Sequence, residues 1–88
     1  MSKLTAHQRK DPNRVRRLAR LRQHFITHPH ADHHTGQLRE LYVEWGFGPK
    51  RSTVKADTKT LAAEGFVLPR GPETKRSHRL NRARLVNL

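Results

Sequence analysis

The apolar residues of this chain are too few to build more than one small hydrophobic core. They make up 33% of the 88 residues, which is less than an ordinary globular domain of this length contains. A chain this short buries only about 60–65% of the surface that its unfolded form exposes. The sequence therefore predicts one small domain, and it excludes large enzyme scaffolds such as a doubly wound nucleotide-binding fold or a barrel.

Three absences narrow the class of protein further. The chain has no cysteine, so it can form neither a disulfide nor a thiolate metal site. It has no apolar run near the roughly 20 residues that a membrane span needs. The basic residues near its start, Lys3, Arg9 and Lys10, are not followed by the apolar run of a signal peptide. We therefore expect a cytoplasmic protein with no membrane partner.

The positive charge of the chain is high and unevenly distributed. The formal net charge is +12 at pH 7, with +7 in residues 1–25, −2 in residues 26–49 and +7 in residues 50–88. Two basic blocks on one small body indicate a polyanionic partner, and nucleic acid is the first candidate. A ribosomal or membrane-surface partner and a purely solubilising surface are the alternatives, although 6% aromatic residues is low for a membrane-surface helix.

The first helix is expected to run from Asn13 to about Thr27. Asp11 and Pro12 before it are typical of a helix start, and Pro29 after it stops the helix. Arg22 falls within the apolar stripe, so either its stem covers the edge of the core or the stripe is narrower. The stripe at helical spacing consists of Val15, Leu18, Ala19, Leu21, Phe25 and Ile26.

Two further helices are expected after a loop or very short strand at residues 28–34. Thr35 is predicted to cap the second helix, whose inner face would present Leu38, Leu41, Tyr42 and Trp45. Residues 46–49 form a strong turn signal. The third helix is expected over residues 50–64, with Gly65 at its end and with Val54, Thr58 and Leu61 facing inward.

A basic hairpin is predicted to follow the helices. Residues 66–68 indicate a short strand, residues 69–73 a turn, and residues 74–80 a second strand. The fold class is therefore mainly α with a small β-hairpin, in the order of a winged helix-turn-helix with three helices plus a wing. We expect a basic flexible arm over residues 1–12, the winged-helix DNA-binding domain over residues 13–82, and a C-terminal tail over residues 83–88.

The third helix is the element expected to read DNA. Its predicted outer face is narrow, basic and hydroxyl-bearing, with Lys50 and Arg51 at its N-terminal edge. Small side chains on that face would let the helix sit deep in the major groove, which is about 12 Å wide. The face consists of Thr53, Lys55, Ala56, Lys59 and Thr60.

The stretch TVKADTKTLAAEGFV, residues 53–67, resembles the recognition helix of bacterial winged helix-turn-helix regulators of the DeoR and GntR types. Arg51-Ser52-Thr53-Val54, which overlaps the start of this stretch, is similar to the start of that helix in GntR-type proteins. Thr58 stands where those families usually carry Leu. The resemblance implies base or phosphate contacts from the helix and phosphate or minor-groove contacts from the wing. The residues expected to bind DNA are Lys50, Arg51, Ser52, Thr53, Lys55, Lys59, Arg70, Lys75 and Arg76.

The histidine-rich segment THPHADHHTG, residues 27–36, resembles the metal-binding motif of metallo-β-lactamase superfamily hydrolases. The fold of those hydrolases needs roughly twice this chain length, and His78 is the only histidine downstream of the segment. A non-catalytic metal site is the alternative, and a polar turn is the simplest interpretation. We therefore expect no enzyme activity and no cofactor. The candidate ligands are His28, His30, Asp32 and His33, with His34 and His24 nearby.

The function predicted from sequence is specific binding of double-stranded DNA by a small transcriptional repressor or a mobile-element (phage or plasmid) accessory factor. An RNA-binding or ribosome-associated basic protein is the alternative. A homodimer is also expected, because the last residues carry apolar side chains beyond the predicted wing; the alternative is a tail lying along phosphates. These side chains are Leu80, Leu85, Val86 and Leu88.

Overall fold

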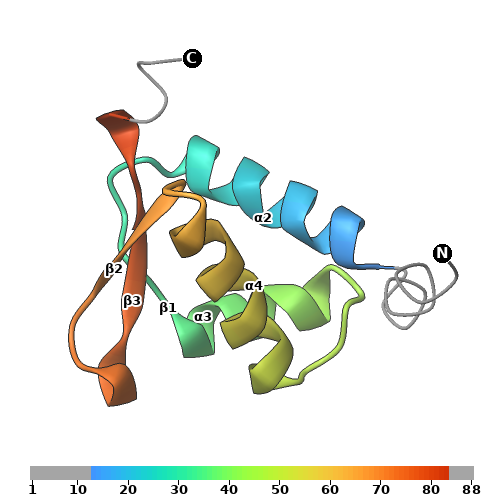
Figure 1. Ribbon diagram of the computed structural model, residues 1–88. Helices are drawn as coiled ribbons and strands as arrows, with labels where there is room; N and C mark the ends of the chain where they lie inside the picture. The colour runs from blue at the N-terminus through green and yellow to red at the C-terminus, as the bar shows by residue number, and fades with distance from the viewer. Residues whose placement is uncertain (1–12, 84–88) are drawn as a thin grey trace, which may run out of the picture.

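The computed structural model describes residues 13–83, which form three helices and a small three-stranded antiparallel sheet. The prediction of a mainly α chain that ends in a β-hairpin is confirmed. Helix α4 contacts both other helices and the hairpin, with α2 above it in the view of Figure 1. The elements are α2 (Arg14–Thr27), β1 (His33–His34), α3 (Thr35–Glu44), α4 (Arg51–Ala63), β2 (Val67–Arg70), the short 3₁₀ helix η1 (Glu73–Lys75) and β3 (Ser77–Leu80).

The predicted hairpin is part of a larger sheet with the order β1-β3-β2. Strand β2 pairs with β3 from Val67 opposite Leu80 to Arg70 opposite Ser77. On the other side of β3, the two-residue strand β1 places His33 opposite His78. Of residues 28–34, predicted as a loop or very short strand, only the last two form a strand, because they pair with backbone groups of β3 that a two-stranded hairpin would leave free.

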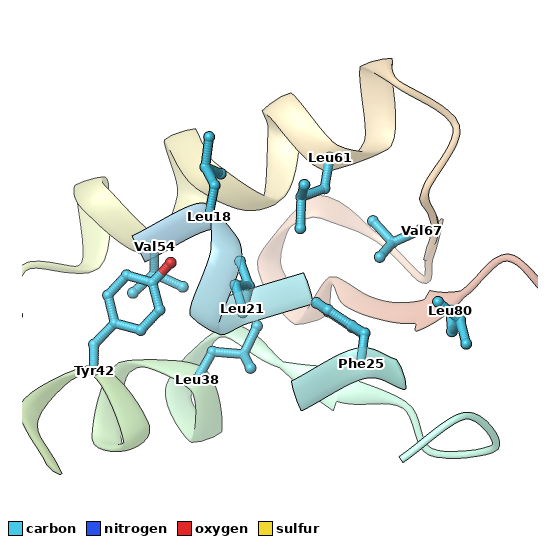
Figure 2. Packing of buried hydrophobic residues seen from close by; sticks show 9 residues of the cluster. All are labelled: Leu18, Leu21, Phe25, Leu38, Tyr42, Val54, Leu61, Val67 and Leu80. Atoms are coloured by element: carbon cyan, nitrogen blue, oxygen red, sulfur yellow. The ribbon is translucent and has the colours of Figure 1, made fainter. Parts of the chain in front are cut away.

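The hydrophobic core draws on every layer of the fold, and Figure 2 shows its nine buried side chains converging between the helices and the sheet. The expectation that Leu80 lies outside a completed core is wrong. Leu80 is only 2% exposed, because its pairing with Val67 directs it into the same interior. The tail residues 84–88 and the arm 1–12 lie outside the described residues, so the homodimer remains a prediction. The core consists of Leu18, Leu21, Phe25, Leu38, Tyr42, Val54, Leu61, Val67 and Leu80.

The buried stripe of α2 is narrower than the sequence predicted. Leu18, Leu21 and Phe25 are buried as expected, whereas Val15 is 77% exposed and Ile26 is 42% exposed. Ala19 is exposed as well. The stripe is completed by a charged residue, Arg17, which is only 6% exposed.

The ends of α3 and α4 are set by local backbone signals. Thr35 is the first residue of α3 and not its cap; the cap is His34, which forms a reciprocal capping box with Gln37. Gly65, with a φ of +77°, ends α4 as predicted. The amide of Gly65 donates to the carbonyl of Ala62, and the amide of Phe66 donates to that of Leu61. This Schellman motif leads the chain directly from α4 into β2.

No helix within residues 13–83 has both the length and the apolar character that a membrane crossing requires.

Candidate nucleic-acid interface

A groove runs between α4 and the wing, which we define as residues 71–76, the loop joining β2 to β3. It consists of two adjoining recesses of about 280 and 620 Å³. Both recesses are lined by Thr35, Lys55, Glu73 and Arg76. We call this surface the α4–wing groove.

Five of the nine residues expected to bind DNA line the α4–wing groove. Helix α4 contributes three of them at a spacing of four residues, which places them along one side of the helix. Glu73 is the only acidic side chain among the described residues that line the groove. The structure therefore brings cations from two separate parts of the sequence to one concave surface. The five are Arg51, Lys55 and Lys59 from α4, and Lys75 and Arg76 from the wing.

The other four expected DNA contacts do not line the groove. Lys50 is the N-cap residue of α4 and is exposed, as is Ser52 in the first turn. Thr53 is partly buried, and Arg70 is exposed at the end of β2. These residues border the groove in the sequence, but the recesses do not include them.

The shape of the wing depends on Gly71 and Arg76. Gly71 has a φ of +81°, and a Cβ placed on it would lie 3.1 Å from the carbonyl oxygen of Lys75. The Nε of Arg76 donates a hydrogen bond of 2.9 Å to the carbonyl oxygen of Gly71. Arg76 therefore closes the loop as well as lining the groove, whereas Lys75 is exposed and forms no side-chain hydrogen bond with a described residue.

The face of α4 turned away from the groove carries a buried charge. Arg17 of α2 donates two hydrogen bonds to the carboxylate of Asp57, Nε to Oδ2 at 2.7 Å and Nη2 to Oδ1 at 3.1 Å. The hydroxyl of Tyr42, which points from α3 toward α4 in Figure 2, donates to the same Oδ2 at 2.8 Å. Burial and this hydrogen bond raise the pKa of Tyr42 above its usual range. One carboxylate thus joins all three helices.

The sequence analysis missed this network, although Asp57 gave a signal. It lies three residues after Val54 and four before Leu61, which places it on the inner face of an amphipathic helix. A carboxylate on that face requires a buried partner. Asp57 is 1% exposed and Arg17 is 6% exposed.

Two more arginines of α2 contact α4. Arg14 donates a 3.0 Å hydrogen bond to the hydroxyl of Thr60, so Thr60 faces α2 and not the outer surface predicted for it. Arg22 forms an ion pair of 2.8 Å with Glu64, and its side chain is 35% exposed. Arg22 therefore lies at the edge of the core and is not part of the buried stripe of α2. Part of the N-terminal basic block therefore contacts the protein's own helix α4 and is not wholly available to a partner.

The histidines form a cluster between α2 and β1. The ring centroid of His24 lies 4.4 Å from that of His28 and 4.9 Å from that of His33. Burial lowers the pKa of His24 to about 4, with further lowering from the charges of His33, His28 and Arg20. Burial also lowers the pKa of His33. A hydrogen bond to the backbone of His28 raises that pKa, but the effect of burial is larger.

Only His28 and His33 of the four candidate metal ligands lie in this cluster, together with His24. Asp32 forms an ion pair with Arg79, with two contacts of 3.0 Å. His30 lies 3.5 Å from Arg82. Within the described part of the chain, no three His, Cys, Asp or Glu side chains are placed to hold a metal ion.

The fold and the site define a small, mostly helical protein with a basic groove between a helix and a hairpin loop. No family model, curated protein or solved structure matches this chain. The geometry of the groove is therefore the basis for inferring function.

Proposed function

We propose that this protein binds double-stranded DNA sequence-specifically as a winged-helix protein, with α4 in the major groove and the wing on the sugar–phosphate backbone. The observation that carries the proposal is the α4–wing groove, where five cations from two distant segments face one acid. The protein would act by occupying its site, as a small transcriptional repressor or a mobile-element accessory factor, without chemistry of its own.

The arrangement of the elements supports this proposal. Three helices precede the hairpin, and β3 lies between β1 and β2 in the sheet, which is compatible with a winged helix. The wing lies beside α4 and borders the same groove. A helix in the major groove and a loop on the neighbouring backbone could therefore contact one duplex together.

The side chains of α4 support a role in reading bases. Arg51 and Lys55 are exposed and one turn apart near the N-terminal end of the helix. Arginine and lysine donate to the acceptors on the major-groove edge of guanine. Ser52 and Ala56, exposed beside them, are small enough to let the helix approach the bases closely.

The direct test is selection of bound sequences from a random duplex pool, followed by titration of the selected duplex, a scrambled duplex and a structured RNA. The proposal requires the selected duplex to bind more tightly than the scrambled one. Equal affinity for both duplexes, or tighter binding of the RNA, contradicts it.

Replacing both Arg51 and Lys55 with alanine is expected to abolish discrimination between the selected and the scrambled duplex. Each good base contact contributes about 1–3 kcal/mol of discrimination. The control is Arg16→Ala with Arg39→Ala, which removes the same charge from exposed positions on α2 and α3. If the Arg51/Lys55 variant discriminates like the wild type, α4 does not read the sequence.

Replacing Arg70 and Lys75 with glutamine is expected to weaken binding to all duplexes alike. Arg76 is left in place because it closes the wing. Each phosphate interaction that the substitutions remove should reduce the log–log slope of affinity against salt by about 0.9. An unchanged slope in titrations at several salt concentrations would mean that the wing points away from DNA.

A further inference from the structure

A buried contact joins Arg17, Asp57 and Tyr42, of which Arg17 is 6% and Asp57 1% exposed. A buried ion pair loses the hydration of both charges, and apolar residues of similar size often stabilise a fold as well or better. Leu18, which follows Arg17 on α2, and Val54, on the inner face of α4, both belong to the apolar core. Apolar side chains could therefore fill this place in the core, and a buried ion pair here is weak evidence of a role in stability alone.

The contact between Arg17, Asp57 and Tyr42 can fix the orientation of α4 about its own axis. The inner face of α4 is otherwise held by Val54, Leu61 and the hydroxyl-bearing Thr58, and the Thr58 hydroxyl bonds back to its own helix at the carbonyls of Val54 and Lys55. Apolar contacts have no preferred direction. A two-bond contact between a guanidinium and a carboxylate fixes distance and angle together.

The position of Asp57 on α4 links this direction to the α4–wing groove. Lys55 and Lys59 each lie two residues from Asp57, which is about 200° around a helix of 3.6 residues per turn. The two lysines therefore lie across the helix from the carboxylate and line the groove. Any rotation of α4 about its axis that moves Asp57 moves both lysines by the same angle.

We propose that Arg17, Asp57 and Tyr42 are positioning residues for the α4–wing groove: they set the rotation of α4, and through it they contribute to discrimination between duplexes. The proposal rests on the proposed function, since it concerns how α4 is presented to DNA. Arg17 and Tyr42 touch no DNA in this arrangement, because both are buried behind α4.

The test is a charge-neutral replacement, Arg17→Met with Asp57→Leu. It removes one positive and one negative charge, so the net charge stays +12 and the salt dependence of binding should not change. We expect a folded protein whose urea midpoint falls by less than that of Asp57→Ala, because both charges of the pair leave together and only the Tyr42 hydroxyl loses its acceptor. Discrimination between the selected and the scrambled duplex should fall about tenfold, as for one misplaced base contact.

The matched control is Arg79→Met with Asp32→Leu. This pair has the same residue types and the same two-bond contact, but it is exposed and lies outside α4. Discrimination should stay at the wild-type value in this variant. An equal loss in both variants would show a general effect of removing an ion pair and would overturn the proposal.

A second variant, Tyr42→Phe, keeps the aromatic ring in the core and removes only the hydrogen bond to Asp57. We expect a several-fold loss of discrimination with little change in the urea midpoint. Wild-type discrimination in both Tyr42→Phe and the Arg17/Asp57 variant overturns the positioning role, and so does an Arg17/Asp57 variant that fails to fold while Tyr42→Phe discriminates normally. A wild-type protein that does not discriminate between duplexes contradicts the proposed function itself.

Discussion

Replacing Asp57 alone with alanine is expected to lower the free energy of unfolding by about 3–5 kcal/mol. The substitution removes the carboxylate that accepts two hydrogen bonds from the buried guanidinium of Arg17, and it removes the acceptor of the Tyr42 hydroxyl. Domains of ordinary stability unfold with about 5–15 kcal/mol, so this one change would remove a large share. Urea denaturation followed by circular dichroism measures it.

The control for this prediction is Asp32→Ala. Asp32 also accepts two hydrogen bonds from one arginine, but its side chain and that of Arg79 are 36% and 37% exposed. An exposed pair typically contributes about 0–1 kcal/mol. If Asp57→Ala destabilises the protein no more than Asp32→Ala does, burial is not what makes the Asp57 contact important.

The two Asp57 experiments give different expectations for stability, and the difference has a physical reason. Asp57→Ala breaks a buried pair and leaves one charge behind. Arg17→Met with Asp57→Leu removes both charges and fills the space with apolar atoms. Breaking a buried pair is strongly destabilising, whereas replacing it is often neutral or favourable.

Helix α4 could be predicted from the sequence because its signals are local. Gly65 has the positive φ that a Schellman motif uses. Val54, Thr58 and Leu61 repeat at helical spacing, and all three are buried as predicted. Its predicted bounds differ by one residue at each end from Arg51–Ala63.

The buried face of α2 could be predicted only in part, because one of its members is charged. Val15 and Ile26 were assigned to the stripe for their apolar character, and both are exposed. Arg17 is buried because its partner Asp57, forty residues later, meets it in the folded chain. Hydropathy along one segment contains no information about a partner at that distance.

The strand β1 and the burial of Leu80 have the same kind of cause. A two-residue strand has too little sequence to show a period, and it exists here because β3 pairs with it. From sequence, Leu80 is expected outside the core because the predicted wing and core need no further residue. Its pairing with Val67 across the hairpin decides its burial.

The cations of the α4–wing groove were all among the residues expected to bind DNA, because charge and helical spacing are visible in the sequence. Arg51, Lys55 and Lys59 follow one side of a predictable helix. How the wing turns back beside α4 was not predictable. It depends on the φ of Gly71 and on the hydrogen bond that Arg76 donates to it.

Lowering the pH from about 7 to 4 is expected to destabilise the protein through its histidines. His33 and His78 are 7% and 6% exposed, and the ring of His24, on α2, packs against that of Trp45 at 5.6 Å between centroids. Burial is the main cause that lowers the pKa of all three, and the charge of Arg76 adds to it at His78. Each ring is therefore favoured in its neutral form in the folded protein.

The direction of the effect follows from proton binding. In the unfolded chain a histidine has a pKa of about 6.5, whereas His24 in the fold has a pKa of about 4. Between these values the unfolded chain binds more protons than the folded one, so the free energy of unfolding falls as the pH falls. Well above pH 6.5 the rings are neutral in both states, and this contribution to stability is fully present.

Urea midpoints measured in steps across this range test the prediction. His24→Gln is expected to make the midpoint less dependent on pH, because one of the rings that must lose its proton on folding is gone. His30→Gln is the control, since His30 is an exposed histidine of the neighbouring loop, and it should keep the wild-type dependence. A wild-type midpoint that stays constant from about pH 7 to pH 4 would show that these histidines accept protons in the fold as readily as in the unfolded chain.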